Sequence, residues 1–201
     1  MLKIENLTFA YPSCEPVLKN FSTVLTGGEL LCVMAPSGSG KSTLLNLIAG
    51  LLRPTDGEIH SDFKKISSVF QEPRLFPWLT VEENVRAVLE KSASAETVAE
   101  ALRLVGLDGC ERLYPSELSG GMKIRLSLAR ALAHNGDLFL LDEPFASLDE
   151  ELRGDLIPRL REILKDRGIS AILVSHHPAD AERFADRILS LEHFVENLIS
   201  T

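Results

Sequence analysis

The stretch from residue 35 to residue 42, Ala-Pro-Ser-Gly-Ser-Gly-Lys-Ser, constrains the fold more than any other part of the chain. It follows an apolar run, Leu30 to Met34, and precedes a segment of helical composition that ends at Gly50. Small side chains allow successive backbone N–H groups to converge on an anion, and a helix start adds its positive dipole end. The sequence therefore predicts a strand, a phosphate-binding loop and a helix, in that order.

Two side chains of this loop are suited to a bound nucleotide. Lys41 would place a positive charge on the β- and γ-phosphates, and the Ser42 hydroxyl would be a ligand of Mg²⁺. The strict pattern begins with glycine, whereas this chain has Ala35, which fits wherever the backbone needs no positive φ. An ordinary strand-to-helix turn is disfavoured because Gly-Lys-Ser follows at the required spacing.

Length and charge limit the other possibilities. A chain of 201 residues suits one domain with an inserted subdomain, and a net charge of -8 argues against broad nucleic-acid binding. The purely apolar runs are far shorter than the roughly 18 residues that span a bilayer, and no basic segment precedes one as in a secretory signal. We therefore expect a soluble protein without a nucleic-acid partner. Because the sequence stops at residue 201, we also expect no C-terminal regulatory domain.

The cysteines do not indicate a metal site. Cys14, Cys32 and Cys110 are scattered, odd in number and without metal-ligand spacing. We interpret them as buried or incidental thiols in a reducing compartment.

The first 71 residues contain several short extended segments. Residues 2 to 11 alternate apolar and polar side chains as a half-buried strand does, and residues 21 to 25 form a second segment. Residues 53 to 58 should break the chain before a strand at Ile66 to Phe70. Tyr11 ends the first segment and would either stack on a purine or only cover the edge of the core.

Residues 72 to 135 are predicted to form a helical insertion. Thr80 has a glutamate three residues later, a capping box that should start a helix running to about Glu90. Ser94 should cap the next helix, which Gly106 ends. Further on, Ser119 is a plausible N-cap, and the two glycines after it leave the N–H groups of the first turn accessible, so this helix start is also suited to an anion. A flexible turn is the alternative.

Carboxylates follow the apolar run from Leu138 to Leu141. Such a run is typical of a central parallel strand, and ligand crevices of α/β folds form at the carboxyl ends of these strands. Asp142 would hold Mg²⁺, directly or through water, and Glu143 would act as the general base on an attacking water. Gln71 ends its own strand, where its amide would hold Mg²⁺ or water if the strand lies beside the phosphate loop.

The last third of the chain contains a helix start, a proline within a helical pattern and a pair of histidines that bear on the fold and the site. The spacing of Ser147 and Glu150 is that of another capping box, so Asp149 would either favour a helix start or have a functional role. Pro158 should kink the following helix or separate two helices. After a strand at residues 169 to 174, His176 and His177 should point to opposite faces, with His176 toward the phosphate site. A last strand near 187 to 191 precedes a short tail.

Together these motifs resemble the ATP-binding cassette (ABC) ATPases over nearly the whole chain. They comprise the loop at 35–42, Gln71, a signature-like Leu-Ser-Gly-Gly-Met at 118–122, the acidic pair at 142 and 143, Asp149 and His176. The resemblance implies an α/β P-loop NTPase core with a parallel central sheet, an N-terminal antiparallel β subdomain and an inserted α-helical subdomain. A single domain over 1–201 would then comprise a core from 1–71 and 136–201 and a helical signature subdomain at about 72–135.

The resemblance also implies a head-to-tail homodimer that binds two ATP molecules with Mg²⁺. Tyr11 would stack on adenine, Gln71 would sense Mg²⁺ and water, His176 would contact the γ-phosphate, and Asp149 would cross the interface. Mg²⁺ would be held by Ser42, Gln71 and Asp142. The nucleotide would contact two sets of residues: Ser37, Gly38, Ser39, Gly40, Lys41, Ser42 and Thr43 of one copy, and Ser119, Gly120 and Gly121 of the other.

The sequence after Gln71, Glu-Pro-Arg-Leu-Phe-Pro-Trp, is similar to that of importers of nitrate, sulfonates and taurine. An importer subunit would bind membrane permeases at the cytoplasmic face, and indirectly a solute-binding protein. The alternatives are a soluble or exporter-type ABC ATPase and a weakly active nucleotide-binding module. Met122 and His177 depart from the family's usual glutamine and aspartate. A thioether cannot complete a capping box with Ser119, so we expect hydrolysis to be retained, at the family's usual rate or below it.

Overall fold

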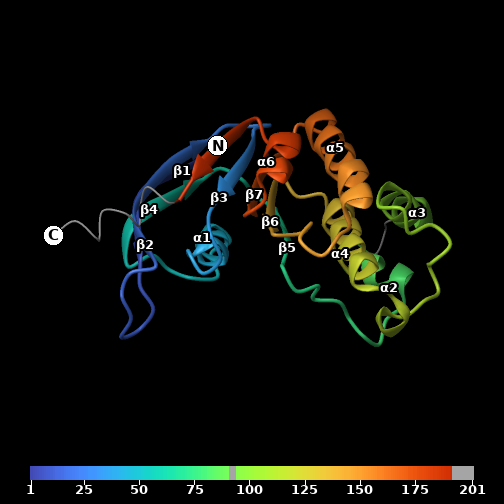
Figure 1. Ribbon diagram of the computed structural model, residues 1–201. Helices are drawn as coiled ribbons and strands as arrows, with labels where there is room; N and C mark the ends of the chain where they lie inside the picture. Colours follow the sequence, from blue (N-terminus) through green and yellow to red (C-terminus); the bar gives the residue numbers. More distant parts are fainter. Residues whose placement is uncertain (91–93, 192–201) are drawn as a thin grey trace.

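The computed structural model describes residues 1–90 and 94–191. Two sheets and a set of helices form in this part of the chain (Figure 1). The strands are β1 (Leu2–Phe9), β2 (Leu18–Leu25), β3 (Leu30–Met34), β4 (Asp56–Ser61), β5 (Ile66–Val69), β6 (Leu138–Asp142), β7 (Ser170–Ser175) and β8 (Arg187–Ser190). The α-helices are α1 (Lys41–Ile48), α2 (Val81–Arg86), α3 (Ala95–Leu104), α4 (Gly120–His134), α5 (Glu150–Asp166) and α6 (Pro178–Phe184).

The larger sheet has five parallel strands in the order β5-β6-β7-β3-β8, and the smaller is antiparallel in the order β2-β1-β4. This arrangement confirms the predicted α/β core and N-terminal antiparallel unit. The expectation that residues 53–58 only break the chain was wrong, because Asp56 begins β4. Most side chains of β4 are polar and exposed, so the strand depends on backbone pairing with β1.

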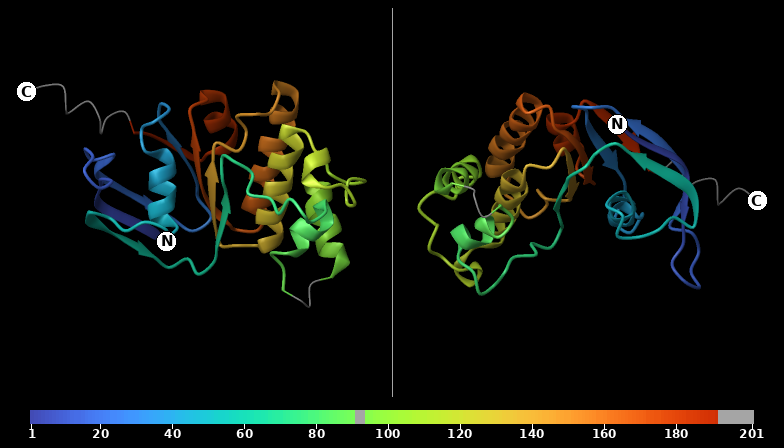
Figure 2. Two further views of the ribbon diagram at one scale, coloured as in Figure 1. Left: turned by 90° about the horizontal axis from the view of Figure 1, so that it is seen from below. Right: turned by 180° about the vertical axis from the view of Figure 1, so that it is seen from behind.

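Each face of the parallel sheet covers its own hydrophobic core. Along β6, Leu138 and Leu140 pack with α1 and the antiparallel sheet, whereas Phe139 and Leu141 pack with helices α2 to α6. The alternation follows from the two-residue period of a strand. In Figures 1 and 2, α1 and the antiparallel sheet lie on one side of the parallel sheet and α4 and α5 lie on the other.

The predicted helix starts are confirmed in the helical segment. Thr80 caps α2 in a capping box with Glu83, and Ser94 caps α3 by accepting a hydrogen bond from the N–H of Thr97. Helix α2 ends at Arg86 rather than near residue 90. Gly106 follows α3 with φ of +65°, as a C-terminal stop requires.

Asp149 favours the start of α5, one of the two roles predicted for it. Its carboxylate, rather than the Ser147 hydroxyl of the expected capping box, accepts a hydrogen bond from the N–H of Leu152. Pro158 lies inside one continuous helix, so it does not separate two helices. Its ring is exposed, so the carbonyl that loses a helical partner lies toward solvent, while Leu156 and Ile157 beside it are buried against the sheet. Helix α6, whose first residue is Pro178, was not predicted from the sequence.

The three cysteines are free thiols, as expected. Cys14 is exposed, whereas Cys32 is buried on β3. Burial, with a smaller effect of the Asp180 charge, raises the pKa of the Cys32 thiol to about 12. No helix within the described ranges combines the length and apolar character needed to cross a bilayer.

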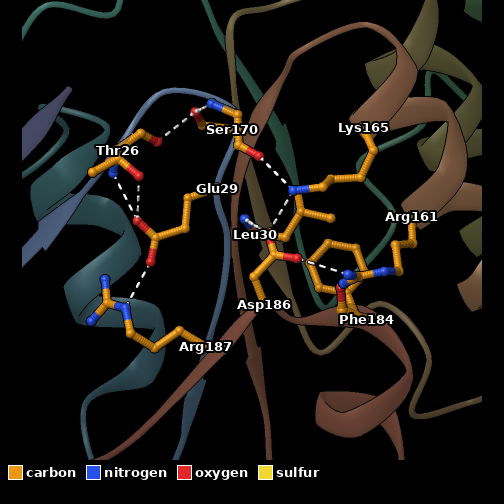
Figure 3. A network of polar contacts seen from close by, with 10 residues as sticks. Thr26, Glu29, Leu30, Arg161, Lys165, Ser170, Phe184, Asp186 and Arg187 are labelled. Carbon is orange, nitrogen blue, oxygen red and sulfur yellow. Dashed lines mark hydrogen bonds and ion pairs between the residues drawn. The ribbon is translucent and has the colours of Figure 1, made fainter.

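A polar network fastens the end of α5 to the amino ends of the parallel strands (Figure 3). Asp186 accepts hydrogen bonds from the Leu30 N–H at 2.9 Å, Lys165 Nζ at 2.8 Å and Arg161 Nη2 at 2.7 Å. Nearby, Glu29 pairs with Arg187 at 2.7 Å. Burial raises the pKa of the Asp186 carboxyl, but these partners outweigh it and hold the pKa below 3.8.

We predict that Asp186→Asn lowers the free energy of unfolding by about 1–2 kcal/mol at pH 7, because charge-assisted bonds are lost while solvent screens part of the network. Since the folded-state pKa is lowered, the contribution of the carboxylate is present above the unfolded pKa and is lost as the pH falls through the folded one. Urea unfolding at pH 7 and near pH 3 measures both effects. Asp155→Asn, which breaks an exposed pair with Arg159, is the control and should change little. An Asp186→Asn effect of equal size at both pH values would contradict the prediction.

Candidate active site

The loop between β3 and α1 has the backbone that the sequence predicts. Gly38 and Gly40 have φ of +81° and +88°. A Cβ on Gly40 would lie 2.6 Å from Val17 Cγ1, whereas one on Gly38 would meet nothing within 4 Å. Ala35 is buried and is not among the residues with positive φ, so a methyl group fits at the first position of the loop.

Lys41 is buried in the loop and directs its ammonium group at three acceptors. Its Nζ donates to the carbonyl oxygens of Ala35 at 2.7 Å and Pro36 at 2.8 Å, and it lies 3.0 Å from Glu143 Oε1. An ammonium group has three donors, so these contacts use all of them. The loop thereby holds a desolvated positive charge at its base.

Glu143 links this lysine to a histidine. It follows β6 with φ of +46°, which is uncommon for a residue with a side chain. Its Oε1 faces Lys41, and its Oε2 lies 2.9 Å from His176 Nδ1. The predicted general base, phosphate-loop lysine and strand-end histidine therefore meet at one point, although they are 33 or more residues apart in sequence.

Asp142 and Ser42 form a pair of oxygen donors beside this point. The Asp142 carboxyl is buried, and burial raises its pKa above 3.8, while a hydrogen bond from Ser42 lowers it and the neighbouring Glu143 charge raises it further. One or two carboxylates with a hydroxyl suit Mg²⁺, which takes most of its remaining ligands from phosphates and water. Among the described residues no cluster of three or more His, Cys, Asp or Glu could hold a metal by itself.

Lys41, Ser42 and Glu143 border a cleft of about 370 Å³, whereas Asp142 and His176 are not part of its wall. Gln71 lines it, as does Tyr11, whose hydroxyl lies 3.2 Å from Thr43 Oγ1 and whose ring packs edge-on against Phe9. The wall comprises Tyr11, Val17, Ser37, Gly38, Gly40, Lys41, Ser42, Thr43, Gln71 and Glu143. Sequence reasoning missed Val17, which comes from the segment before β2 and carries no polar group that would draw attention to it.

The signature-like segment lies outside this cleft. Ser119 caps α4 by accepting a hydrogen bond from the N–H of Met122 at 3.2 Å, which confirms the predicted cap, and Ser119 and Gly120 are not part of the cleft wall. Asp149 is exposed at the start of α5. A second opening, bordered by Gln71, Glu72, Glu143, Ala146 and Ser147, adjoins the first through Gln71 and Glu143.

The prediction that His176 and His177 point to opposite faces was wrong. They follow β7 rather than lying within it, and their rings lie side by side, tilted by 39° with centroids 4.1 Å apart. The chain turns there into α6, for which His177 is the N-terminal boundary residue. The two-residue alternation of a strand therefore no longer applies.

We predict that Gly40→Ala weakens ADP binding about tenfold or more, because strain at positive φ adds to the clash with Val17. Gly38→Ala is the matched control: it has the same backbone strain and no clash, so its effect should be smaller. Val17→Ala combined with Gly40→Ala should restore part of the affinity. Isothermal titration calorimetry measures all three, and equal losses at positions 38 and 40 would contradict the assigned clash.

Comparisons with known proteins agree with this geometry. The family model described as "ABC transporter" matches residues 18–146. The chain is 39% identical over 208 residues to a thiamine import ATP-binding protein, ThiQ, of Chelativorans sp. (strain BNC1), with 96% of this chain and 84% of the relative covered. It is 42% identical over 182 residues to an aliphatic sulfonates import ATP-binding protein, SsuB, of Bacillus anthracis, with 86% of this chain and 72% of the relative covered.

Solved structures are similar as well. The dimeric structure of MJ0796, a bacterial ABC transporter cassette, matches with a TM-score of 0.87 at 32% identity over 94% of each chain. A post-hydrolysis state of the same cassette, bound to ADP and Pi, matches with a TM-score of 0.85 at 31% identity, again over 94% of each chain. The family model covers more than half of the chain and the relatives cover most of it, so this chain belongs to the ABC transporter family of ATP-binding proteins.

Proposed function

We propose that the chain is the ATP-hydrolysing subunit of an ABC importer. The observation that carries the proposal is that Glu143 contacts both Lys41 and His176 at the base of the phosphate loop. The relatives' names support import, since ThiQ and SsuB are both import ATP-binding proteins. A weakly active binding module is disfavoured because the lysine and both carboxylates are present and in place.

The reaction is phosphoryl transfer to water, in which positioning and charge stabilisation do most of the catalysis. The loop N–H groups and Lys41 bind the phosphates, and a phosphate bound there competes with Glu143 for the ammonium group. Glu143 then orients and deprotonates the attacking water. His176 holds the Glu143 carboxylate through Oε2, the oxygen that does not face Lys41. Gln71 borders the opening through which the water approaches. Tyr11 offers its ring to adenine. Ser42, Gln71 and Asp142 would hold Mg²⁺, which would neutralise part of the charge of the phosphates.

A second copy of the chain completes the site. The start of α4 has a glycine pair, Gly120 and Gly121, yet it does not border the loop of its own chain. In a head-to-tail dimer this helix start approaches the partner's γ-phosphate, and Asp149 crosses the interface. The opening beside Gln71 and Ser147 is the side from which the partner enters. The dimeric structure of a similar cassette supports this arrangement.

The permease binds at the seam between the core and the helical segment. A pocket of about 190 Å³ lies there between β5 and α4, lined among others by Phe70, Arg74 and Arg130. Trp78 comes shortly after Phe70 and Arg74 in the sequence, is 70% exposed and supplies apolar surface. Through this contact the subunit sits on the cytoplasmic face of the membrane, and the solute-binding protein acts on it only through the permease. We infer that the seam divides a core of residues 1–71 and 136–191 from a helical subdomain at about 72–135; the predicted continuation of the core to residue 201 lies outside the described residues.

We predict that Glu143→Gln lowers ATP turnover at least about a hundredfold while ATP binding is kept, because the amide cannot accept the proton from water. The variant should accumulate as an ATP-bound dimer, which gel filtration with and without ATP detects. Glu72→Gln, an exposed neighbour in the same opening, is the control. Normal hydrolysis by Glu143→Gln, or a variant that stays monomeric with ATP, would count against the proposal.

Met122 tests the signature segment separately. Its side chain packs against the helical core and has no hydrogen-bond donor, so we expect the backbone donors of residues 119–121 to bind phosphate without its help. We expect the parent to hydrolyse ATP and Met122→Gln to raise the rate a few-fold, since a glutamine would complete the capping box with Ser119. Initial rates of phosphate release measure this. A parent without turnover beside a fully active variant would show that the thioether inactivates the site.

A further inference from the structure

Two facing buried side chains have atoms without hydrogen-bond partners. Within residues 1–90 and 94–191 the buried, unpaired side-chain nitrogen and oxygen atoms are Arg125 Nε, Arg153 Nε and Asp180 Oδ1. Arg153 Nη1 lies 3.7 Å from Asp180 Oδ1, with 11% and 2% of the two side chains exposed. The two charges are enclosed but too far apart for a hydrogen bond. Moving them closer together would therefore strengthen their interaction.

Arg153, on the first turns of α5, reaches back to the loop that precedes the helix. Its Nη2 donates to the carbonyl oxygens of Phe145 at 3.2 Å and Leu148 at 3.4 Å. This loop runs from Glu143 to Asp149, so it joins the proposed general base to the residue proposed to cross the dimer interface. A displacement of the loop therefore moves the guanidinium group.

Asp180, on α6, is tied to the other catalytic segment. Its Oδ2 accepts a hydrogen bond from the Ser175 hydroxyl at 3.4 Å, and that hydroxyl accepts one from the N–H of His177 at 3.0 Å. Its own N–H donates to the His177 carbonyl at 3.2 Å. The residues on both sides of His176 are thus connected to the Asp180 carboxylate or its backbone.

We propose that Arg153 and Asp180 are positioning residues that couple the loop at 143–149 to His176. When the partner copy presses on this loop, Arg153 closes the 3.7 Å gap to Asp180, and the shift passes through Ser175 to His176. The His176–Glu143 bond is already 2.9 Å long in a single chain, and the shift aligns this pair with the attacking water when the dimer assembles. This inference rests on the proposed ATPase function and adds a route by which dimerisation reaches the catalytic pair.

The same contacts could serve only to brace α5 against α6. In that case breaking them would lower stability without a specific effect on turnover. The chain offers a matched control, because Arg183 of α6 pairs with Glu150 of α5 at 2.9 Å on the exposed rim of the same helix contact. Arg183→Gln removes a bracing contact and keeps both Arg153 and Asp180. Glu150 also lies 4.0 Å from Arg153 Nη1, so this control shows the effect of a change at the same helix contact that spares the 3.7 Å pair.

Steady-state ATPase kinetics of the purified chain distinguish the two roles. We expect Asp180→Asn to lower kcat about tenfold with KM within about twofold, a loss typical of a misplaced catalytic group. Asp180→Glu, which has a longer reach, should keep most of the activity, and Arg183→Gln should be close to the parent. Because Asp180→Asn removes the buried charge that faces Arg153, Ser175→Ala provides a second, uncharged break in the same connection. It should likewise lower kcat and leave KM nearly unchanged. Unchanged kcat in both variants would overturn the proposal.

A double-mutant cycle tests whether the effect passes through His176. In a His176→Ala background, Asp180→Asn should change kcat less than about twofold, because the residue it positions is already gone. A full tenfold loss in that background would overturn the coupling. Thermal unfolding of every variant shows whether the fold is retained.

One further measurement separates failure of the inference from failure of the proposed function. If the parent shows no phosphate release, the proposed function fails, and the coupling is tested by NMR on the isolated chain. The His176 imidazole resonances, assigned with His176→Gln, should shift in Ser175→Ala and Arg153→Lys and stay unchanged in Arg183→Gln. Resonances that respond to none of these variants, or equally to all of them, would overturn the coupling.

Discussion

The parallel pairing of β7 with both β3 and β6 fixes the relative positions of the groups at the site. Met34 pairs with Ser175, and Asp142 pairs with Val174, so three strands end at the same edge. The last carbonyls of β7 then accept hydrogen bonds from the residues that start the two loops: Val174 from the Glu143 N–H at 3.1 Å and Ser175 from the Ala35 N–H at 3.4 Å. The phosphate loop and the acidic loop are therefore positioned by the same backbone.

Helix α5 is held at both ends by charged contacts of different kinds. Its C-terminal part binds Asp186 through Lys165 and Arg161 at the amino ends of the strands (Figure 3), where the bonds are 2.7 Å and 2.8 Å long. Its first turns contact α6 twice: Glu150 pairs with Arg183 at 2.9 Å on the exposed rim, and Arg153 lies 3.7 Å from Asp180 in the interior. Both ends of the helix are thus attached, and the enclosed Arg153–Asp180 pair beside the acidic loop is the contact that has room to tighten. A helix anchored in this way can transmit a local shift of the loop without moving as a whole.

Sequence patterns predicted the buried strands and the residue types of the site, but not how distant segments meet. Strands β3, β6 and β7 are mostly or wholly apolar because both of their faces are covered, whereas β4 escaped prediction because its residues are mostly polar and only pairing with β1 makes it a strand. Continuity through Pro158 depends on burial of its neighbours, which the local rule for proline ignores. Likewise, the phosphate loop and the acids after β6 follow local rules, but the bond of Glu143 to His176 joins residues 33 positions apart and depends on packing. His176 and His177 lie side by side rather than on opposite faces, because the strand ends at Ser175, before either histidine.

Two of the three departures from the family pattern, Ala35 and Met122, have different physical consequences. Ala35 occupies a backbone position where a Cβ is accommodated, and its carbonyl oxygen still accepts from Lys41, so the loop keeps its geometry. Met122 leaves the Ser119 cap intact but removes the side chain that would have returned a hydrogen bond to the Ser119 N–H. We expect the first departure to be neutral because only the backbone at position 35 takes part in the site. The second removes a contact that would have fixed the orientation of a helix start, and that helix start is the part of the site that we propose the partner copy contributes.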